Sequence, residues 1–146
     1  MSYEGPIAVL PKGDTMSKNQ KGSCLCGAVT YEVSGELRPV CACHCNQCRK
    51  TSGHYVAATQ ARSEDLTIHG DAIQWYQSSD KAERGFCGTC GSNLFWRRFA
   101  GTKTSIFAGT LDGETGLTMD TQIHSQSAGD YYSLPDVRIG EQSEVS

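Results

Sequence analysis

The chain reads Cys24-Leu25-Cys26-Gly27-Ala28-Val29-Thr30-Tyr31-Glu32-Val33. Apolar residues alternate with polar ones from Val29 to Val33, which is the pattern of a half-buried β-strand. The two cysteines ahead of the strand are too close in sequence to bridge each other easily, but they readily point two sulfurs at one metal ion. This stretch therefore predicts a strand that begins at a metal site.

The remaining cysteines form two more tight groups. A CxCxxC runs from Cys43 to Cys48, with Cys41 two residues upstream, and a CxxC runs from Cys87 to Cys90. Such spacing is typical of metal sites, so the eight cysteines indicate a zinc protein with two ions. A disulfide framework is the alternative. It is disfavoured because the apolar run at 7–10 is too short for a signal-peptide core, so we expect a reducing, cytoplasmic setting.

We expect the first zinc site to be structural. Its four thiolates come from two distant groups, and they are Cys24, Cys26, Cys87 and Cys90. Four thiolates complete the tetrahedral coordination of zinc, so no position remains for a substrate. Metal binding at such a site contributes directly to the free energy of folding. The alternative is a set of buried free cysteines.

The second zinc site has three expected ligands, which are Cys43, Cys45 and Cys48. Three thiolates leave a fourth coordination position, and an open position is the mark of a catalytic or ligand-binding zinc. Such a site suits an incoming thiol, whose pKa the metal lowers. Cys41 is the best candidate to close the site, ahead of His44 and His54. Closure would make it a second structural zinc.

Arg49 follows the second cysteine group directly and is our candidate substrate-binding residue. A guanidinium there would pair with a carboxylate of an anionic thiol, although a solvated basic turn fits equally well. The same two interpretations apply to Arg84, Arg97 and Arg98. No side chain is identified as a catalytic acid or base, and His69 and His124 are expected at the surface or in turns.

Composition narrows the class of protein. The formal net charge is −3 and the basic residues are unclustered, which argues against a nucleic-acid partner. No segment approaches the ~18 apolar residues of a membrane span. A length of 146 residues suits one domain. We expect a flexible N-terminal extension over residues 1–20, with Met16 as an alternative start to Met1, and a single zinc-binding β domain over 21–146.

Short strand patterns dominate the rest of the chain. Besides 28–33, the candidate strands are 55–61, 66–68, 73–76, 94–96 and 105–108. The segment 69–72, between two of these, resembles a hairpin turn. No stretch keeps a helical period over ten residues, and at most a turn or two of helix fits around 46–51. We therefore predict an all-β domain of short antiparallel strands pinned by zinc, with little helix.

The three cysteine motifs, taken in order, resemble those of the glutathione-dependent formaldehyde-activating (GFA) family, which also includes the centromere protein V group. Residues 22–31 are similar to its opening motif, 43–53 to its central motif and 86–94 to its third. Residues 109–112 resemble a later strand-and-turn segment. The resemblance covers about residues 21–135.

The resemblance implies a β fold of coiled antiparallel sheets, of the RabGEF/TCTP-like kind, with zinc at both cysteine sets named above. It also implies carbon–sulfur bond chemistry. The family's type activity joins glutathione to formaldehyde, giving S-hydroxymethylglutathione, and is classed as a carbon–sulfur lyase. One segment departs from the pattern. Family members commonly carry His-Ile-aromatic near the C-terminus, then a lysine and a tryptophan, where this chain has Gln122-Ile123-His124.

Two functional hypotheses follow. The first is a zinc-dependent carbon–sulfur lyase that acts on the adduct of a thiol, glutathione, with formaldehyde or a similar small aldehyde. The second is a non-catalytic zinc module that binds a small thiol or a protein partner. An open second site favours the enzyme, whereas its closure by Cys41 favours the module.

Overall fold

The computed structural model of the chain describes residues 19–145. The larger part of the expected N-terminal extension and the alternative start at Met16 lie outside the described residues. Within the described range the fold is mostly β, as predicted, with two sheets and two short α-helices, α2 (Asn46–Ser52) and α3 (Gln142–Val145). The prediction of a short helix after the CxCxxC is therefore confirmed.

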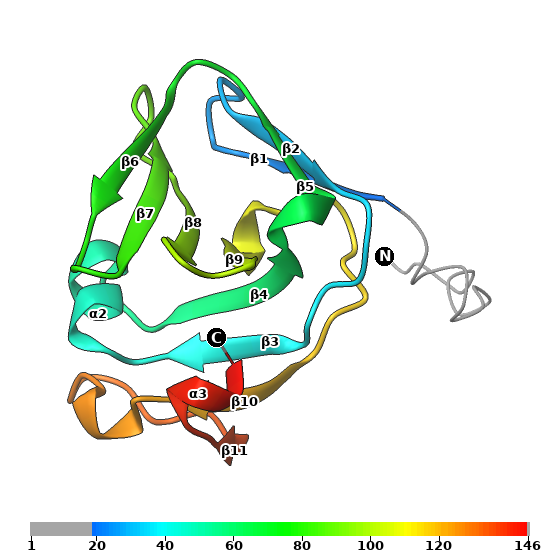
Figure 1. The fold of residues 1–146 in the computed structure, drawn as a ribbon. Coiled ribbons are helices and arrows are strands. Elements are labelled where there is room, and N and C mark those ends of the chain that lie inside the picture. The colour runs from blue at the N-terminus through cyan, green and yellow to red at the C-terminus, as the bar shows by residue number, and fades with distance from the viewer. Residues whose placement is uncertain (1–18, 146) are drawn as a thin grey trace, which may run out of the picture.

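The smaller sheet has three antiparallel strands in the order β1-β2-β5, which are β1 (Gln20–Ser23), β2 (Thr30–Val33) and β5 (Leu66–His69). The larger sheet has eight strands in the order β11-β10-β3-β4-β9-β8-β7-β6. Their bounds are β3 (Val40–Cys43), β4 (Val56–Arg62), β6 (Ile73–Gln77), β7 (Ala82–Cys87), β8 (Asn93–Arg98), β9 (Lys103–Phe107), β10 (Met119–Ile123) and β11 (Arg138–Ile139). Figure 1 shows the larger sheet curling from β11 at the bottom to β6 at the upper left, with the smaller sheet across the top.

The core lies between the two sheets. Val29, Tyr31 and Val33 are buried together, as their alternation predicted, and they pack with Phe95 and Ile106 of the larger sheet. The ring of Tyr31 meets that of Phe95 edge-on, with centroids 5.2 Å apart. Each such side chain contributes about 1.5–3 kcal/mol when fully buried, so this face fixes how β2 sits on the larger sheet.

The predicted hairpin at 69–72 is wrong. β5 pairs with β2 in the smaller sheet, whereas β6 pairs with β7 in the larger one. The segment crosses from the smaller sheet to the larger one, because the strands before and after it pair with different strands. Ile68 packs beside β2, while Trp75 stacks on Phe95 with ring centroids 6.0 Å apart.

Two strand pairs differ from the antiparallel pattern expected throughout. β10 runs parallel to β3 on one side and to β11 on the other. An alternating pattern marks a strand but carries no information on its direction. β10 follows a long connection from β9 that returns the chain to the starting end of β3, so it enters the sheet in the same direction as β3.

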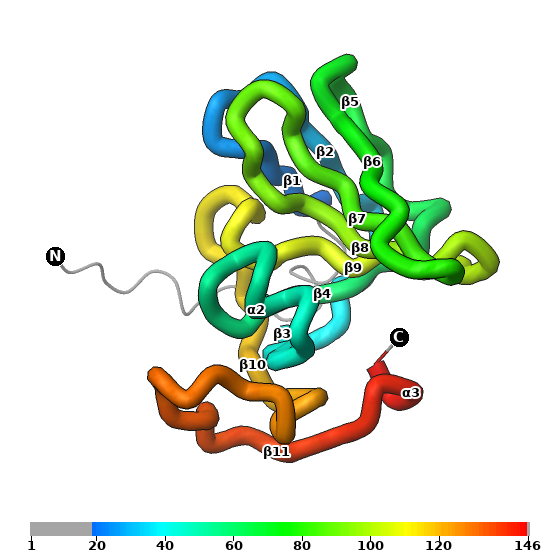
Figure 2. The backbone as a smooth tube through the Cα atoms, turned by 90° about the vertical axis from the view of Figure 1, so that its left-hand side faces the viewer, coloured from blue at the N-terminus to red at the C-terminus, as the bar shows by residue number. Residues whose placement is uncertain are grey.

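The segment after β10 forms a separate layer below β3. Figure 2 shows it running along the lower edge of the molecule and ending at α3. This layer positions α3 so that Val145 meets Arg38, just before β3, and Gln142 meets His124, just after β10. Among residues 19–145, no helix is long and apolar enough to cross a membrane.

Candidate metal centres and the adjoining cavity

The first cysteine group joins two loops that are far apart in sequence. Cys24 and Cys26 precede β2, while Cys87 ends β7 and Cys90 lies on the turn after it. The four Sγ atoms all lie within 4.8 Å of one another. Cys26 Sγ is 3.7 Å from Cys24 Sγ and 3.8 Å from Cys87 Sγ. Four sulfurs this close are the donor set that zinc prefers, so the group fits a tetrahedral metal ion.

Backbone amides point at the sulfurs of this group. Val29 N–H donates to Cys24 Sγ at 3.3 Å, and the N–H groups of Thr89 and Cys90 donate to Cys87 Sγ at 3.3 and 3.4 Å. Such donors favour the thiolate, which is the form that binds metal. The turn after Cys87 depends on Gly91, whose φ of 82° lies in the left-handed region that suits glycine.

The second cysteine group is local. Cys43 ends β3, Cys45 is the N-cap of α2, and Cys48 lies in the first turn of that helix. Their three Sγ atoms lie within 4.8 Å of one another. Cys48 N–H donates to Cys45 Sγ at 3.3 Å, so the helix cap itself fixes the spacing of two of the sulfurs.

The three sulfurs of this group compete for one negative charge. Hydrogen bonds from the thiols of Cys43 and Cys48 lower the pKa of Cys45 to about 2. The same contact with Cys45 raises the pKa of Cys43 far above its usual range. The group therefore holds one thiolate easily and resists a second. A divalent cation would remove this conflict, because its charge lets all three thiols ionise.

The candidates to close this site do not join the three sulfurs, although Cys41 lines the same cavity. Cys41 is buried on the same strand, but its sulfur is not among the mutually close atoms in the described chain. The ring of His54 packs against those of Tyr55 and Tyr132, with centroids 4.2 and 4.4 Å away. Neither side chain joins the three sulfurs, which leaves one side of the group uncovered by a fourth ligand.

His44 uses both of its ring nitrogens in other contacts. Its Nε2 is 2.9 Å from Gln122 Oε1, and its Nδ1 is 2.8 Å from the hydroxyl of Tyr132. The amide nitrogen of Gln122 donates to the carbonyls of Pro135 and Val137, so its oxygen must accept from His44 Nε2–H. Burial lowers the pKa of His44, which favours this neutral form. His44 therefore ties the cysteine loop to the C-terminal layer.

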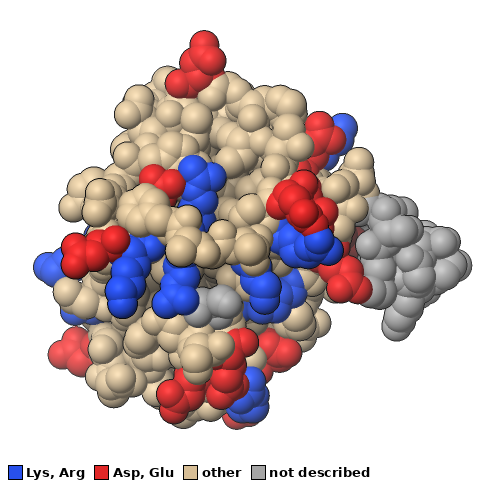
Figure 3. Space-filling model, in the orientation of Figure 1, with Lys and Arg blue, Asp and Glu red and all other residues tan. Residues whose placement is uncertain are grey.

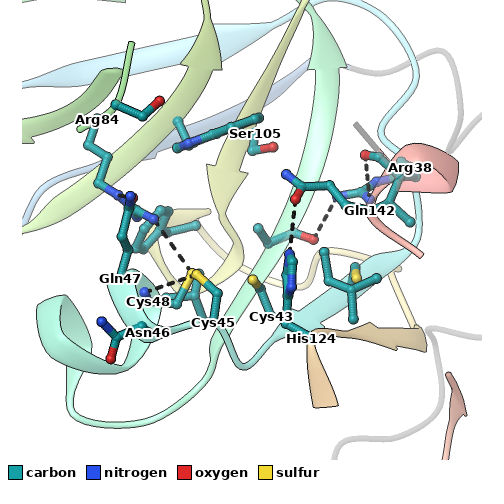
Figure 4. A pocket seen from close by; sticks show the side chains of 18 residues that line it. Arg38, Cys43, Cys45, Asn46, Gln47, Cys48, Arg84, Ser105, His124 and Gln142 are labelled. Atoms are coloured by element: carbon teal, nitrogen blue, oxygen red, sulfur yellow. Dashed lines mark hydrogen bonds between the residues drawn. The ribbon is translucent and has the colours of Figure 1, made fainter. Parts of the chain in front are cut away.

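A cavity of about 470 Å³ adjoins the second cysteine group. Cys43, Cys45 and Cys48 form one wall, and apolar side chains such as Val56 and Phe107 form others. Figure 4 shows Arg84 and Arg38 on opposite sides of the sulfurs. Among residues 19–145, no aspartate or glutamate lines the cavity, so its ionisable groups are arginines, a histidine and cysteine thiols.

Arg84, on β7, is the arginine that reaches the sulfurs. Only 8% of its surface is exposed, and its Nη2 lies 3.7 Å from Cys48 Sγ. Its Nε donates to Gln47 Oε1 at 3.1 Å. Arg49 does not line the cavity, since its guanidinium donates to Asn46 at 2.6 Å, and its role in substrate binding stays a prediction. Arg97 pairs instead with a glutamate of β7.

No sequence pattern selected Arg38, and His124 was expected at the surface or in a turn. Arg38 lines the cavity and donates to the carbonyl of Val145, 107 residues away in sequence. His124 also lines the cavity, and its φ of 56° makes it the one non-glycine residue with positive φ in the described chain. A signal for His124 existed, because it lies in the segment Gln122-Ile123-His124 that departs from the family pattern.

Comparison with known proteins agrees with this arrangement. Residues 19–127 match the family described as glutathione-dependent formaldehyde-activating enzyme, GFA. The chain belongs to the GFA family. This confirms the predicted family and, with it, the prediction of a lyase-type enzyme.

Several relatives of this GFA-family chain are named. The chain is 28% identical to a Schizosaccharomyces pombe protein named as an uncharacterised lyase. The match extends over 116 residues and covers 78% of this chain and 84% of the relative. The chain is 31% identical over 93 residues to a Pyrenophora teres f. teres protein named provisionally as a glutathione-dependent formaldehyde-activating enzyme, with 60% of this chain and 49% of that protein covered. A crystal structure of a Rhodobacter sphaeroides protein matches with a TM-score of 0.54 and 31% identity, over 66% of this chain and 91% of the other.

Proposed function

We propose that the chain is a zinc-dependent carbon–sulfur lyase of the GFA type. Its substrate is the adduct of a thiol, glutathione, with formaldehyde or a similar small aldehyde. In the synthetic direction the thiol sulfur bonds to the aldehyde carbon, and the thiol proton ends on the aldehyde oxygen. RSH and CH₂O thus give RS–CH₂–OH with no further reactant.

One observation carries this proposal. The sulfurs of Cys43, Cys45 and Cys48 lie together in the wall of a cavity of about 470 Å³, within the usual range for small-molecule sites. Cys41, the best candidate to close the site, is not part of the group. This geometry favours the enzyme over the non-catalytic zinc module.

Zinc held by these three sulfurs would lower the pKa of an incoming thiol. The chain's own residues account for the rest of the site. Arg84 lies against Cys48, where its charge offsets that of the thiolates and can pair with a substrate carboxylate. Apolar walls limit water, and holding thiol and aldehyde in one cavity favours their addition through proximity.

The same proposal assigns a structural zinc to the other group, Cys24, Cys26, Cys87 and Cys90, within one domain over residues 21–146. Cys24 and Cys87 belong to the buried core cluster, so a metal there would tie β2 to β7. We also propose a cytoplasmic setting, because all eight cysteines are free and thiols persist in a reducing compartment.

The test is a calorimetric titration of glutathione into zinc-loaded protein. Wild type should bind saturably, and Cys45→Ser should lose this binding together with one zinc while keeping the β fold. Cys41→Ser is the matched control for metal content, because Cys41 lines the cavity without joining the three sulfurs, and it should keep both zinc ions. Aldehydes add to thiols without a catalyst, so turnover is measured by NMR as exchange between glutathione and its hydroxymethyl adduct at equilibrium.

The outcomes separate the two functions. Exchange that rises in proportion to protein concentration, and does not rise with Cys45→Ser, supports the lyase. Saturable binding without faster exchange would support the non-catalytic binding module instead of the lyase. Absence of binding in wild type that carries two zinc ions would reject glutathione as the ligand.

A further inference from the structure

Two arginines in the cavity wall form no direct ion pair with a carboxylate of the described residues. Within residues 19–145, the arginines in ion pairs are Arg62, Arg97 and Arg138, and neither Arg38 nor Arg84 is among them. A half-buried guanidinium without a counter-charge is costly unless an anion can reach it. Arg84 has the thiols beside it, whereas Arg38 lies on the opposite side of the cavity (Figure 4).

The guanidinium of Arg38 donates hydrogen bonds to neutral carbonyls, and the nearest acid, Asp120, acts on it only by electrostatic attraction without contact. Its Nη2 donates to the carbonyl of Ala58 on β4 at 3.1 Å, and its Nη1 donates to the carbonyl of Val145 at 3.1 Å. Its Nε is buried and has no hydrogen-bond partner. A guanidinium presents its N–H groups in a planar fork that matches a carboxylate, so Arg38 has donors for an acid, and no carboxylate of the described chain contacts it.

The group that now contacts Arg38 is weakly anchored. Val145 belongs to α3, a helix of four residues in which no residue is buried. Gln142, at its other end, contacts His124 Nε2 through Oε1 at 2.9 Å, and both Gln142 and Val145 line the cavity. Helices this short have little stability of their own, so α3 depends on these contacts at the cavity.

We infer that Arg38 is a specificity-determining residue that binds a carboxylate of the thiol substrate, in exchange for the carbonyl of Val145. This inference rests on the proposed function and deepens it, because it selects anionic thiols as the substrate class. The exchange is favourable since a carboxylate adds an opposite full charge and can accept two parallel N–H bonds from the guanidinium, which a single neutral carbonyl cannot do. Figure 3 shows a row of basic side chains across the middle of one face, which would favour the approach of such an anion.

The test compares glutathione with its diethyl ester, in which both carboxylates are masked, by calorimetry on zinc-loaded protein. Arg38→Gln should raise the Kd for glutathione about 10-fold or more, as expected for losing a hydrogen bond to a charged group. The Kd for the diethyl ester should stay unchanged. Arg62→Gln is the control, since Arg62 is exposed on β4 and lies outside the cavity lining. Circular dichroism checks that each variant is folded.

Binding and turnover distinguish this inference from the proposed function. Equal weakening of glutathione and its ester by Arg38→Gln would overturn the role of Arg38 while leaving the lyase intact. If glutathione binding depends on Arg38 but adduct exchange is not faster, the role of Arg38 in binding would be supported and the lyase activity rejected. Failure of wild type to bind glutathione would overturn both.

A second measurement does not depend on changing Arg38. On adding glutathione, backbone amides of residues 141–145 should exchange with deuterium faster, because the substrate displaces α3. A chain that stops after Glu141 should bind glutathione several-fold more tightly than the full chain, since the competing carbonyl is gone. Unchanged exchange and an unchanged Kd would mean that α3 and the substrate do not share Arg38, and the inference would fall.

Discussion

Cys87 and Cys41 are both buried cysteines, with 0% and 4% of their surface exposed, yet their surroundings differ. Cys87 Sγ lies within 4.8 Å of three other sulfurs, whereas Cys41 contacts the carbonyl of Ala42 on its own strand. The spacing of the motifs predicted that these four sulfurs meet, because two distant cysteine pairs with this pattern are typical of one shared metal site. It left the role of Cys41 open, because two residues of separation put Cys41 on the same side of β3 as Cys43 without fixing the distance between their sulfurs.

The two residues should respond differently to serine. Cys87→Ser removes a proposed structural ligand, and structural zinc contributes on the order of 10 kcal/mol, as much as the whole stability of a typical domain. We expect this variant to unfold or aggregate. Cys41→Ser should remain folded with two zinc ions per chain and lose roughly 1 kcal/mol. Circular dichroism melts and zinc analysis test both. A soluble Cys87→Ser with an unchanged melting temperature would contradict the structural assignment.

At the scale of elements, the alternation of apolar residues predicted β2, β4, β8 and β9, but it did not predict their partners. The segment around Gly70 illustrates why. A turn signal between two strand patterns favours a hairpin locally, yet β5 pairs with β2 and β6 pairs with β7, and Ile68 and Trp75 both pack against the core between the sheets. The contacts that decide this are distant in sequence, so the local pattern could not reveal them.

Gly70 gives a test of this crossing between sheets. Its φ is 116°, and a Cβ added there would collide with the carbonyl oxygen of Ala28. Gly70→Ala should therefore lower the free energy of unfolding by about 1–3 kcal/mol, because both the backbone conformation and the close approach exclude a side chain. Gly109→Ala is the control, since no atom lies within 4 Å of its added Cβ. Chemical denaturation of both variants measures the difference, and equal stabilities would mean that the crossing tolerates a side chain.

At the scale of the whole molecule, the three cysteine motifs predicted which sulfurs meet, whereas the cavity could not be predicted. Its lining comes from β3, β4, β7, β9 and the C-terminal layer, and Arg38 reaches Val145 across 107 residues of sequence. A cavity of this kind is a product of packing between segments that carry no shared motif. The departure from the family pattern at Gln122-Ile123-His124 could be recognised in the sequence. Only the fold shows that Gln122 hydrogen-bonds His44 and that Ile123 and His124 line the cavity.

The two proposed zinc ions should leave the molecule in a fixed order. The three sulfurs of the second group are local and face the cavity, whereas the first group joins β2 to β7 and includes two core cysteines. A chelator added stepwise should therefore remove one zinc with the β fold retained and the glutathione binding lost, and should unfold the chain as the second zinc leaves. A metal-sensitive dye measures the released zinc while circular dichroism measures the fold. Mild acid should remove the two ions in the same order, because protonated thiols do not hold the metal. Loss of both ions in one step, together with the fold, would show that the two sites are not independent.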